Sequence, residues 1–497
     1  MEQTTSFEIT ANQYTLFAFI GYILIILIVG LLSTRFSSRG LNEFFLGGRK
    51  MNKFVVALSA VASGRSSWLL IGLTGMAYIQ GLSAIWAAVG YIIVEYLMFI
   101  FAAPRLRDQT ENYDNLTIPD YFESRHNDST HMLRILSVII IVVFMTAYIS
   151  AQLNAGGKAF SASFEVSQFT GIVITAIIVI VYTLLGGFLA VSITDVIQAL
   201  FMLIALFVLP IVAIVDFGGI DQVITALDRY DSAFIDPFAL STGALIGFVG
   251  IGLGSPGNPH ILVRYMSIEK SEQLRFSAYV GTFWNILMAA AAVLIGLVGR
   301  AYFMSATTLP DGDPESIFPY LAQIHLHPVL FGIIIASILA AIMSTADSML
   351  LVSASSIIRD IYQKIIAPHK ELTDKQLVLY SRLIIFLLML AAFVFGYIAQ
   401  DLVFWLVLFA WGGLGAAFGP PLLLSLFWRK TNKYGVAAGF IGGMLTVIIW
   451  KSVEVLNNFL YELVPAFLIS TFLTIVFSLA IKPTNRYRII KDLNAEE

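Results

Sequence analysis

Long apolar runs recur along the whole sequence, and this pattern constrains the fold more than any other feature. A helix needs about 20 mostly apolar residues to cross about 30 Å of hydrocarbon. Lipid offers no hydrogen bonds to the backbone, so such runs must be helical. Thirteen runs meet this requirement, near residues 14–33, 54–80, 84–103, 132–156, 168–186, 190–214, 239–258, 276–303, 328–357, 379–398, 402–427, 434–453 and 459–481. The sequence therefore predicts an all-α membrane protein with thirteen transmembrane helices.

Composition supports a single transmembrane domain over residues 1–497, with no soluble domain. Only 12% of the residues are charged and the mean hydropathy is +0.85, whereas about 25% of the residues in soluble domains are charged. The net charge of −3 and the scattered bases give no indication of a nucleic-acid partner. There is no cysteine, and the histidines have no metal-binding spacing. We therefore expect neither an enzyme nor an organic cofactor.

The basic residues predict the orientation in the membrane. With the N-terminus outside, thirteen helices place all but five of the 29 Lys and Arg residues in cytoplasmic segments; among these are Arg264 and the pair Arg429 and Lys430. Such an excess is expected of cytoplasmic loops. No Lys or Arg precedes the first run, which argues against a cleaved signal peptide. We expect a multi-pass protein of the inner (plasma) membrane with its C-terminus in the cytoplasm.

Two of the runs contain residues that a continuous helix disfavours. The second run carries small and polar residues around one charge, at 63–67, and the seventh carries glycines and two prolines within 254–259. The two runs are five helices apart, so each break would lie in the first helix of a repeat, if helices 2–6 and 7–11 are inverted repeats. Breaks at matching positions indicate a midplane solute site. The alternative is that small residues only allow close helix packing.

Ionisable residues inside the runs are a second indication of function. Arg65, Glu95, Asp195 and Asp347 lie within apolar segments, where a charge costs about 2.5–3.5 kcal/mol and needs a partner. Asp347 follows Ser344 and Thr345, and a carboxylate with hydroxyls suits a hard cation such as Na⁺. Alternatively, the hydroxyls bond only to their own helix.

Six short motifs match a known family in order and in position. They are Phe44-Phe-Leu-Gly-Gly-Arg49, Pro119-Asp-Tyr-Phe-Glu-Ser-Arg125, Gly186-Gly-Phe-Leu-Ala-Val-Ser-Ile-Thr-Asp195, Asn258-Pro-His-Ile-Leu-Val-Arg264, Leu339-Ala-Ala-Ile-Met-Ser-Thr345 and Gly415-Ala-Ala-Phe-Gly-Pro420. Through them the chain resembles the solute:sodium symporter family, and within it the bacterial sodium/proline symporters. The resemblance extends from Asn42 to Lys482.

This resemblance implies a fold and a set of site residues. It implies a leucine-transporter-like core of inverted 5+5 repeats in helices 2–11, at about 54–427, with peripheral helices near 14–33, 434–453 and 459–481. The positions that match the family's main Na⁺ site are Ala62, Arg65, Ala341, Ser344 and Thr345. The positions that match the proline carriers' solute site are Trp68, Tyr148, Ile251, Ser255 and Pro259, and Gln152 lies one turn beyond Tyr148. Asp195 matches a carboxylate used in sodium coupling; with Asp347 and Glu95 it completes the predicted coupling residues.

The departures from the family pattern leave the role of Na⁺ open. Gly64 and Arg65 stand where the proline carriers have aspartate and methionine. Two unit charges about 4 Å apart interact by about 4 kcal/mol at an effective dielectric of about 20, so a guanidinium directed into the site would replace Na⁺. It is equally open whether Arg65 reaches Glu95 or a helix end. Ile251 and Ser255 also replace aromatic residues of the proline carriers.

We expect a secondary active transporter that carries Na⁺ together with proline, or with a similar small amino acid or zwitterion, by alternating access. The alternative is a sodium-independent exchanger or facilitator in which Arg65 replaces the ion. A transporter-like sensor is less favoured, because the sequence stops about sixteen residues after the last run. The expected partners are the zwitterionic solute and the lipid bilayer, with no obligatory protein partner.

Overall fold

The computed structural model describes residues 12–37, 46–185, 188–368, 373–398 and 401–481. Within these ranges ten helices are long and apolar enough to cross a membrane. One of them, the continuous helical stretch Lys53–Asn112, covers two of the predicted runs, and two further apolar helices, Gln168–Leu184 and Thr242–Gly257, are shorter. The all-α class is confirmed; the count of thirteen spans and the inverted repeat remain predictions.

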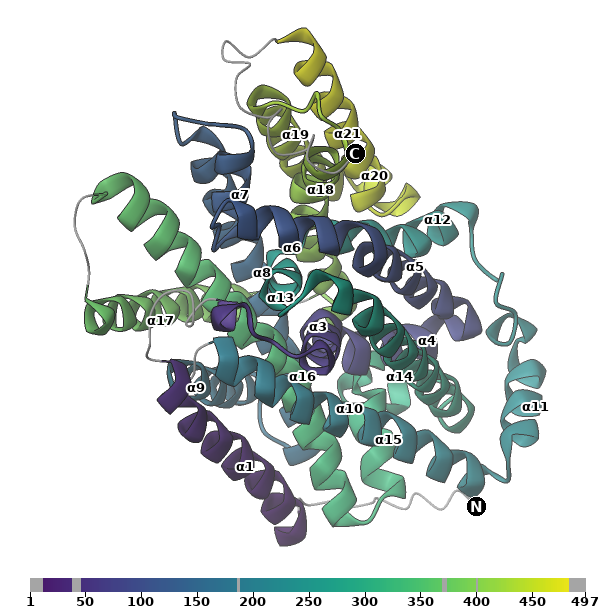
Figure 1. Ribbon diagram of the computed structural model, residues 1–497. Helices are drawn as coiled ribbons and strands as arrows, with labels where there is room; N and C mark the ends of the chain where they lie inside the picture. Colours follow the sequence, from purple (N-terminus) through teal and green to yellow (C-terminus); the bar gives the residue numbers. More distant parts are fainter. Residues whose placement is uncertain (1–11, 38–45, 186–187, 369–372, 399–400, 482–497) are drawn as a thin grey trace, which may run out of the picture.

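The helices follow one another with short connections, and the described residues contain no strand (Figure 1). In the first half of the chain they are α1 (Gln13–Ser37), α3 (Lys53–Ser67), η2 (Trp68–Leu73), α4 (Thr74–Gln80), α5 (Ile85–Leu97), η4 (Met98–Ala102), α6 (Ala103–Asn112), α7 (Ile118–Arg125), α8 (Met132–Phe164), α9 (Gln168–Leu185), α10 (Phe188–Phe217) and α11 (Ile220–Tyr230). In the second half they are α12 (Thr242–Gly250), η6 (Ile251–Gly257), α13 (Pro259–Ser267), α14 (Leu274–Tyr302), η10 (Pro314–Ser316), α15 (Ile317–His325), α16 (Pro328–Ser355), η11 (Ser356–Ile366), α17 (Asp374–Ile398), α18 (Val403–Phe427), α19 (Lys433–Ser452), α20 (Glu454–Phe459) and α21 (Leu463–Ala480).

Polar side chains and one glycine set several helix ends. Asn52, Thr117 and Ser241 each accept a hydrogen bond from a backbone N–H in the first turn of α3, α7 and α12, as N-cap residues do. Gly81 ends α4 with a φ of +71°, and a Cβ there would lie 2.4 Å from the Phe234 carbonyl oxygen. Only glycine suits this turn, which separates the second and third predicted runs.

Burial distinguishes a central set of helices from an outer one. The apolar windows of α16 and α18 are mostly buried, whereas those of α1, α17 and α21 are mostly exposed, as expected for helices that face lipid. Figure 1 shows α3 near the middle of the bundle, with α1 on one side and α19 and α21 on the opposite side. α3 packs on both α16 and α10. The two predicted breaks therefore lie on central elements.

Segments predicted to be cytoplasmic meet at one end of the bundle. The contacts are Met51 N–H to Ser267 C=O at 3.1 Å, Arg107 Nε to Ile268 C=O at 2.7 Å, Arg125 Nε to Ser425 C=O at 3.2 Å and Lys433 Nζ to Asp128 Oδ1 at 3.4 Å. Their meeting agrees with the predicted alternation of the helices. Which face of the membrane this end occupies remains a prediction, and residues 1–11 and 482–497 lie outside the described residues.

Candidate functional site

The first predicted break is a real interruption between α3 and η2. Ser66 has φ 52° and ψ −168°, which no helix contains. Its hydroxyl accepts the Trp68 N–H at 3.1 Å and lies 3.4 Å from the Tyr148 hydroxyl. The Ser67 N–H donates to Gln152 Oε1 at 3.0 Å. Side chains of α8 thus satisfy backbone and hydroxyl groups that the break leaves free.

The second predicted break is also present. After α12 the backbone tightens into the 3₁₀ helix η6 and leaves helical geometry at Asn258 (φ −98°, ψ 102°). Helix α13 then begins with Pro259 in its first turn. Asn258 Nδ2 donates to the Gly254 carbonyl at 2.8 Å, and Trp411 Nε1 donates to the Ile251 carbonyl at 2.8 Å. Gly254 packs on the Trp411 ring so closely that a Cβ would lie 1.9 Å from Nε1. The glycines therefore allow η6 to lie against α18.

The two breaks lie next to each other. A Cβ on Gly64 would lie 3.2 Å from Ile261 Cδ1, and the rings of Tyr148 and His260 are 6.1 Å apart in an edge-to-face arrangement. α3 and α13 therefore pack together immediately beside both interruptions. The two interruptions therefore lie side by side inside the bundle.

Three of the predicted solute-site residues are brought together at the first break. Trp68, Tyr148 and Gln152 are buried and connected through Ser66 and Ser67. The Trp68 ring also stacks on Phe404, with centroids 5.4 Å apart, and contacts Tyr91 edge to face at 5.7 Å. The result is an aromatic wall made from η2, α5, α8 and α18.

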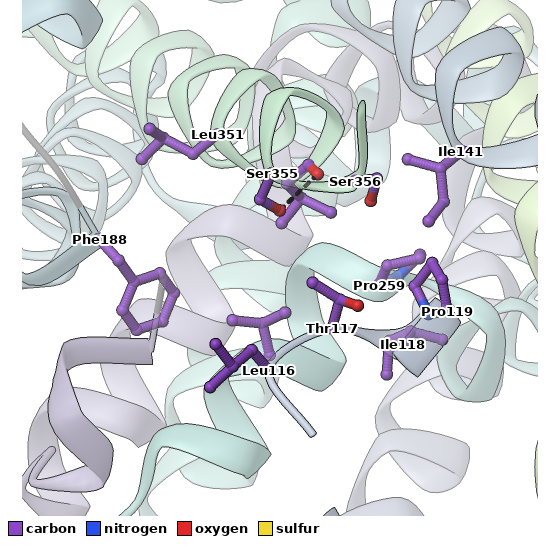
Figure 2. A pocket seen from close by; sticks show the side chains of 12 residues that line it. Leu116, Thr117, Ile118, Pro119, Ile141, Phe188, Pro259, Leu351, Ser355 and Ser356 are labelled. Carbon is purple, nitrogen blue, oxygen red and sulfur yellow. Dashed lines mark hydrogen bonds between the residues drawn. The ribbon is translucent and has the colours of Figure 1, made fainter. Parts of the chain in front are cut away.

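The other three predicted solute residues lie along the second break. Ile251 and Ser255 are on η6, which packs against α18. Pro259 lines a narrow pocket towards the end of the bundle where the predicted cytoplasmic segments meet, which we call the basic end. Figure 2 shows Pro259 beside Thr117 and Pro119 and opposite Ser355 and Ser356. The Ser255 hydroxyl has no hydrogen-bond partner among the described residues, and the membership of Ile251 and Ser255 in one solute site with the first three residues remains a prediction.

Several buried polar atoms near the breaks have no hydrogen-bond partner among the described residues. They are Ser67 Oγ, Trp68 Nε1, Gln152 Nε2, Ser255 Oγ, Asn258 Oδ1 and both ring nitrogens of His260. A buried polar group without a partner is costly, so such atoms are suited to meet a polar solute. Ser67, Asn258 and His260 were not among the predicted solute residues, although their position beside the breaks was an available signal.

The predicted Na⁺ positions join α3 to α16. Ser344 Oγ lies 3.3 Å from the Ala62 carbonyl oxygen and 3.1 Å from that of Ala341. Thr345 Oγ1 donates to the Ser63 carbonyl at 3.0 Å. The Arg65 carbonyl accepts the Trp68 N–H. Two hydroxyls and several carbonyls form the oxygen-only donor set that a hard cation prefers, so these residues fit a transported Na⁺.

The Arg65 side chain points away from these oxygens. It forms an ion pair with Glu95, and both side chains are only 2% exposed. Its guanidinium carbon lies 3.8 Å from the centre of the Tyr91 ring, and Asn285 Nδ2 donates to Glu95 Oε2 at 2.9 Å. The sequence left open whether Arg65 points into the Na⁺ site, towards Glu95 or towards a helix end, and the structure places it against Glu95. The alternative in which Arg65 itself replaces the ion therefore loses its geometric basis.

Asp195 and Asp347 belong to a network that includes an unexpected arginine. Arg264 Nη2 lies 2.8 Å from Asp195 Oδ2, and the two side chains are 1% and 0% exposed. Ser348 connects this pair to Asp347, whose Oδ1 accepts its hydroxyl at 3.1 Å. The assignment of Arg264 to a cytoplasmic loop is therefore wrong. α13 continues two turns past the break and carries the arginine into the bundle.

A buried carboxylate holds the other end of the bundle together. Glu315 accepts hydrogen bonds from the N–H groups of Val403 at 2.8 Å and Phe404 at 2.9 Å, at the start of α18. Lys158 Nζ of α8 lies 2.7 Å from its Oε2, and Glu315 Cγ packs against Gly75 of α4. Burial raises the pKa of the Glu315 carboxyl, although the Lys158 charge acts in the opposite direction. Glu315 thus ties three helices to one loop.

Comparisons with known proteins agree with this architecture. The sequence model of the sodium:solute symporter family matches residues 44–443. The sodium/proline symporter of Staphylococcus aureus (strain NCTC 8325 / PS 47) is 37% identical over 99% of this chain and 98% of its own length. The solved structure of a substrate-bound, outward-open Na⁺-coupled sialic acid symporter covers 95% of this chain and 99% of its own, with a TM-score of 0.80 and 19% identity. MhsT in complex with L-phenylalanine covers 87% of this chain and 99% of its own, with a TM-score of 0.54 and 14% identity. The chain therefore belongs to the sodium:solute symporter family and is a multi-pass membrane transporter.

Proposed function

We propose that this protein is a secondary active transporter of the plasma membrane that symports Na⁺ with proline or a similar small zwitterion by alternating access. The observation that carries the proposal is the meeting of two helix breaks beside Trp68, Tyr148 and Gln152. Interrupted helices that meet inside a membrane bundle expose backbone groups able to hold a small charged solute. The 37% identity to a sodium/proline symporter supports proline as the first solute to test.

The surroundings of the first break favour a solute without net charge. Arg65 is neutralised by Glu95 and Arg264 by Asp195, so neither offers a free charge to a ligand. Apart from atoms of the two ion pairs and of Asp347, the groups near the breaks without a partner among the described residues are neutral: an indole N–H, an amide, hydroxyls and an imidazole. Neutral donors and half-helix ends suit a carboxylate and an amine together. The Trp68 ring and its neighbour Phe404 supply an apolar surface for the body of a proline or an aliphatic amino acid.

Na⁺ enters the proposal as a transported substrate. The hydroxyls of Ser344 and Thr345 and the carbonyl of Ala62 converge between α3 and α16. Because Arg65 is held by Glu95, its charge does not occupy this place. An ion bound there would stabilise the contact between α3 and α16. Asp195 is connected to the same region through Ser63, which supports its predicted role in coupling.

Purified protein in proteoliposomes tests the proposal directly. A Na⁺ gradient should drive uphill uptake of radiolabelled proline, and replacement of Na⁺ by choline should abolish accumulation. Uptake that is unchanged in choline would contradict symport and favour the exchanger or facilitator. Saturable binding without any uptake would favour a sensor.

A matched pair of variants tests the solute site. Trp68→Ala removes the stacked ring from the first break, whereas Trp405→Ala removes a neighbouring, partly exposed tryptophan of α18. We expect the first to raise the proline KM about tenfold or more, since tenfold corresponds to about 1.4 kcal/mol, and the second to leave it nearly unchanged. Equal effects would place the solute elsewhere.

A further inference from the structure

Arg264 lies in a buried cage of oxygen atoms that three other helices supply. Its Nη2 is 2.5 Å from Ser63 Oγ, 2.7 Å from Ser348 Oγ and 2.8 Å from Asp195 Oδ2. Its Nε donates to Ser59 Oγ at 2.7 Å. One nitrogen thus meets oxygens of α3, α10 and α16. Hydroxyl and carboxylate oxygens are also the ligands that hard cations prefer, so the guanidinium occupies a cation's environment.

This cage adjoins the predicted Na⁺ positions. The hydroxyl oxygens of Ser63 and Ser348 each lie 2.8 Å from the Ser344 carbonyl oxygen. Thr345 Oγ1 in turn donates to the Ser63 carbonyl. Ser63 therefore contacts Arg264 with its hydroxyl and the Na⁺ positions with its carbonyl. An ion that binds to Ser344 and Thr345 would lie close to the positive charge of Arg264.

The cage and its immediate neighbours contain two carboxyl groups but one guanidinium. Asp195 and Asp347 are both fully buried; Asp195 bonds directly to the Arg264 guanidinium, whereas Asp347 is connected to it through the Ser348 hydroxyl. Asp195 Oδ1 and Asp347 Oδ2 have no partner among the described residues. Buried carboxylates need positive charge close by, which favours the approach of a small cation. The guanidinium opposes that approach, because like charges repel strongly in a low dielectric.

The helix that carries Arg264 is separated from α12 by the break at Asn258. At its far end a backbone bridge from Ile268 to Met51 ties α13 to the segment that precedes α3. Pro259 and Val263 of the same helix line the narrow pocket at the basic end (Figure 2). Widening this pocket by moving α13 would therefore withdraw Arg264 from the cage.

We propose that Arg264 is a tethered cation that competes with Na⁺ for the Asp195 cage, so that Na⁺ binds strongly only when α13 has drawn the guanidinium away. The inference rests on the proposed function, in which Na⁺ is a transported substrate. It gives α13 a direct electrostatic connection to the ion. It also assigns the role of a built-in cation to Arg264, instead of to Arg65.

The first test is a Na⁺ titration of full-length protein in detergent. Na⁺ replaces K⁺ at constant ionic strength, and the apparent melting temperature is recorded. In Arg264→Gln we expect the Na⁺ concentration for half-maximal stabilisation to fall about tenfold or more relative to the unmodified protein, because a nearby positive charge is removed. Adding Asp195→Asn to this variant should abolish the gain. Arg125→Gln removes a buried arginine that donates to the Ser425 carbonyl, outside the cage, and should leave the midpoint unchanged.

A charge-retaining variant covers the case in which Arg264→Gln does not fold. Arg264→Lys keeps the positive charge, but lysine can lose its proton whereas arginine cannot. Competition predicts that Na⁺ binding expels the lysine proton, so the Na⁺ midpoint should fall as the pH rises from 7 to 9.5. The unmodified protein should show no such dependence on the charge at position 264. A purely structural arginine would not produce this difference.

The outcomes separate this inference from the proposed function. No shift of the Na⁺ midpoint in folded Arg264→Gln, together with a pH-independent midpoint in Arg264→Lys, overturns the competition. Absence of Na⁺-driven proline uptake by the unmodified protein instead overturns the proposed function. A Na⁺ response that appears or sharpens only after removal of the guanidinium supports competition even when proline is not the solute.

Discussion

Among single residues, Arg65 and Glu95 form an ion pair that is buried inside the bundle. Their side chains are 2% exposed, and Asn285 and the Tyr91 ring provide further contacts. A buried ion pair contributes little net stability compared with apolar residues of similar size, but removing one partner leaves an uncompensated charge. The pair therefore determines what substitutions the first break tolerates.

We predict that a single substitution in this pair lowers the stability of the folded protein more than a substitution of both residues does. Glu95→Gln should destabilise the protein by about 3–5 kcal/mol, since Arg65 then keeps an unpaired charge. Arg65→Met combined with Glu95→Met should recover most of that loss. Apparent melting temperatures in one detergent measure both, and Arg229→Met, which changes an exposed arginine of α11, serves as the control. A double variant less stable than Glu95→Gln would contradict the argument.

The sequence indicated that Arg65 is buried but did not indicate the same for Arg264. Arg65 stands out because it lies within an apolar run, and Glu95 was an available partner on the next helix. Arg264 follows an apolar segment, where a base usually marks a loop. Only the turn at Asn258 and the short length of α13 bring it to Asp195. Pairing across helices depends on packing that no local pattern encodes.

Among the elements, the loop that contains η10 connects three helices, α4, α8 and α18. Glu315 contacts α8 through Lys158, α18 through two N–H groups and α4 through Gly75. Hydrogen bonds to a charged acceptor are worth more than neutral ones, about 1.5–3 kcal/mol each. We infer that this cluster keeps α4, α8 and α18 together at the end of the bundle opposite the predicted cytoplasmic segments.

We predict that Glu315→Gln loosens this cluster. Glutamine has one acceptor oxygen and no charge for Lys158, so the start of α18 should separate more often. The sequence has no cysteine, so Phe404→Cys provides a single reporter at a buried position beside Trp68. Its labelling by a maleimide should accelerate about tenfold in the Glu315→Gln background, for a loss of about 1.4 kcal/mol. Asp311→Asn, an exposed change in the same loop, is the control, and unchanged labelling would contradict the assignment.

The sequence located both helix interruptions through local chemistry: small and polar residues around Arg65 indicated the first, and glycines with two prolines indicated the second. It did not reveal the cluster around Glu315, which lies in a connection between predicted runs. The carboxylate becomes recognisable only when the loop is placed on the start of α18. Local chemistry thus predicted where the helices break, and tertiary packing decided what closes over them.

At the scale of the whole molecule, the predicted orientation gives each end of the bundle a definite side of the membrane. His327 precedes α16 and Lys364 lies near the end of η11, and both are exposed at opposite ends of the same long helical stretch. We predict that His327→Cys is labelled in intact cells by an impermeant maleimide, whereas Lys364→Cys is labelled only after permeabilisation. The reverse pattern would invert the topology. Similar labelling of both would show that the helix count between them is wrong.

Acid should destabilise the whole molecule in part through His126, which connects α7 to the end of α18 by a 2.8 Å contact with Ser425 Oγ. Burial, aided by the adjacent charge of Arg125, lowers the pKa of His126 to about 3. Between that value and the unfolded pKa of about 6.5, the His126 imidazole is protonated in the unfolded chain but neutral in the folded protein. Stability therefore falls as the pH falls through this window, by at most about 1.4 kcal/mol per pH unit.

Other acid-sensitive groups, such as Asp128, add their own pH dependence, so the informative quantity is the difference between the variant and the unmodified protein. The melting temperature of His126→Gln should fall less steeply between pH 6.5 and 4.5 than that of the unmodified protein, while His327→Gln should follow the unmodified curve. Parallel curves for all three would mean that His126 protonates freely in the folded state, and that the contact between α7 and α18 opens to water.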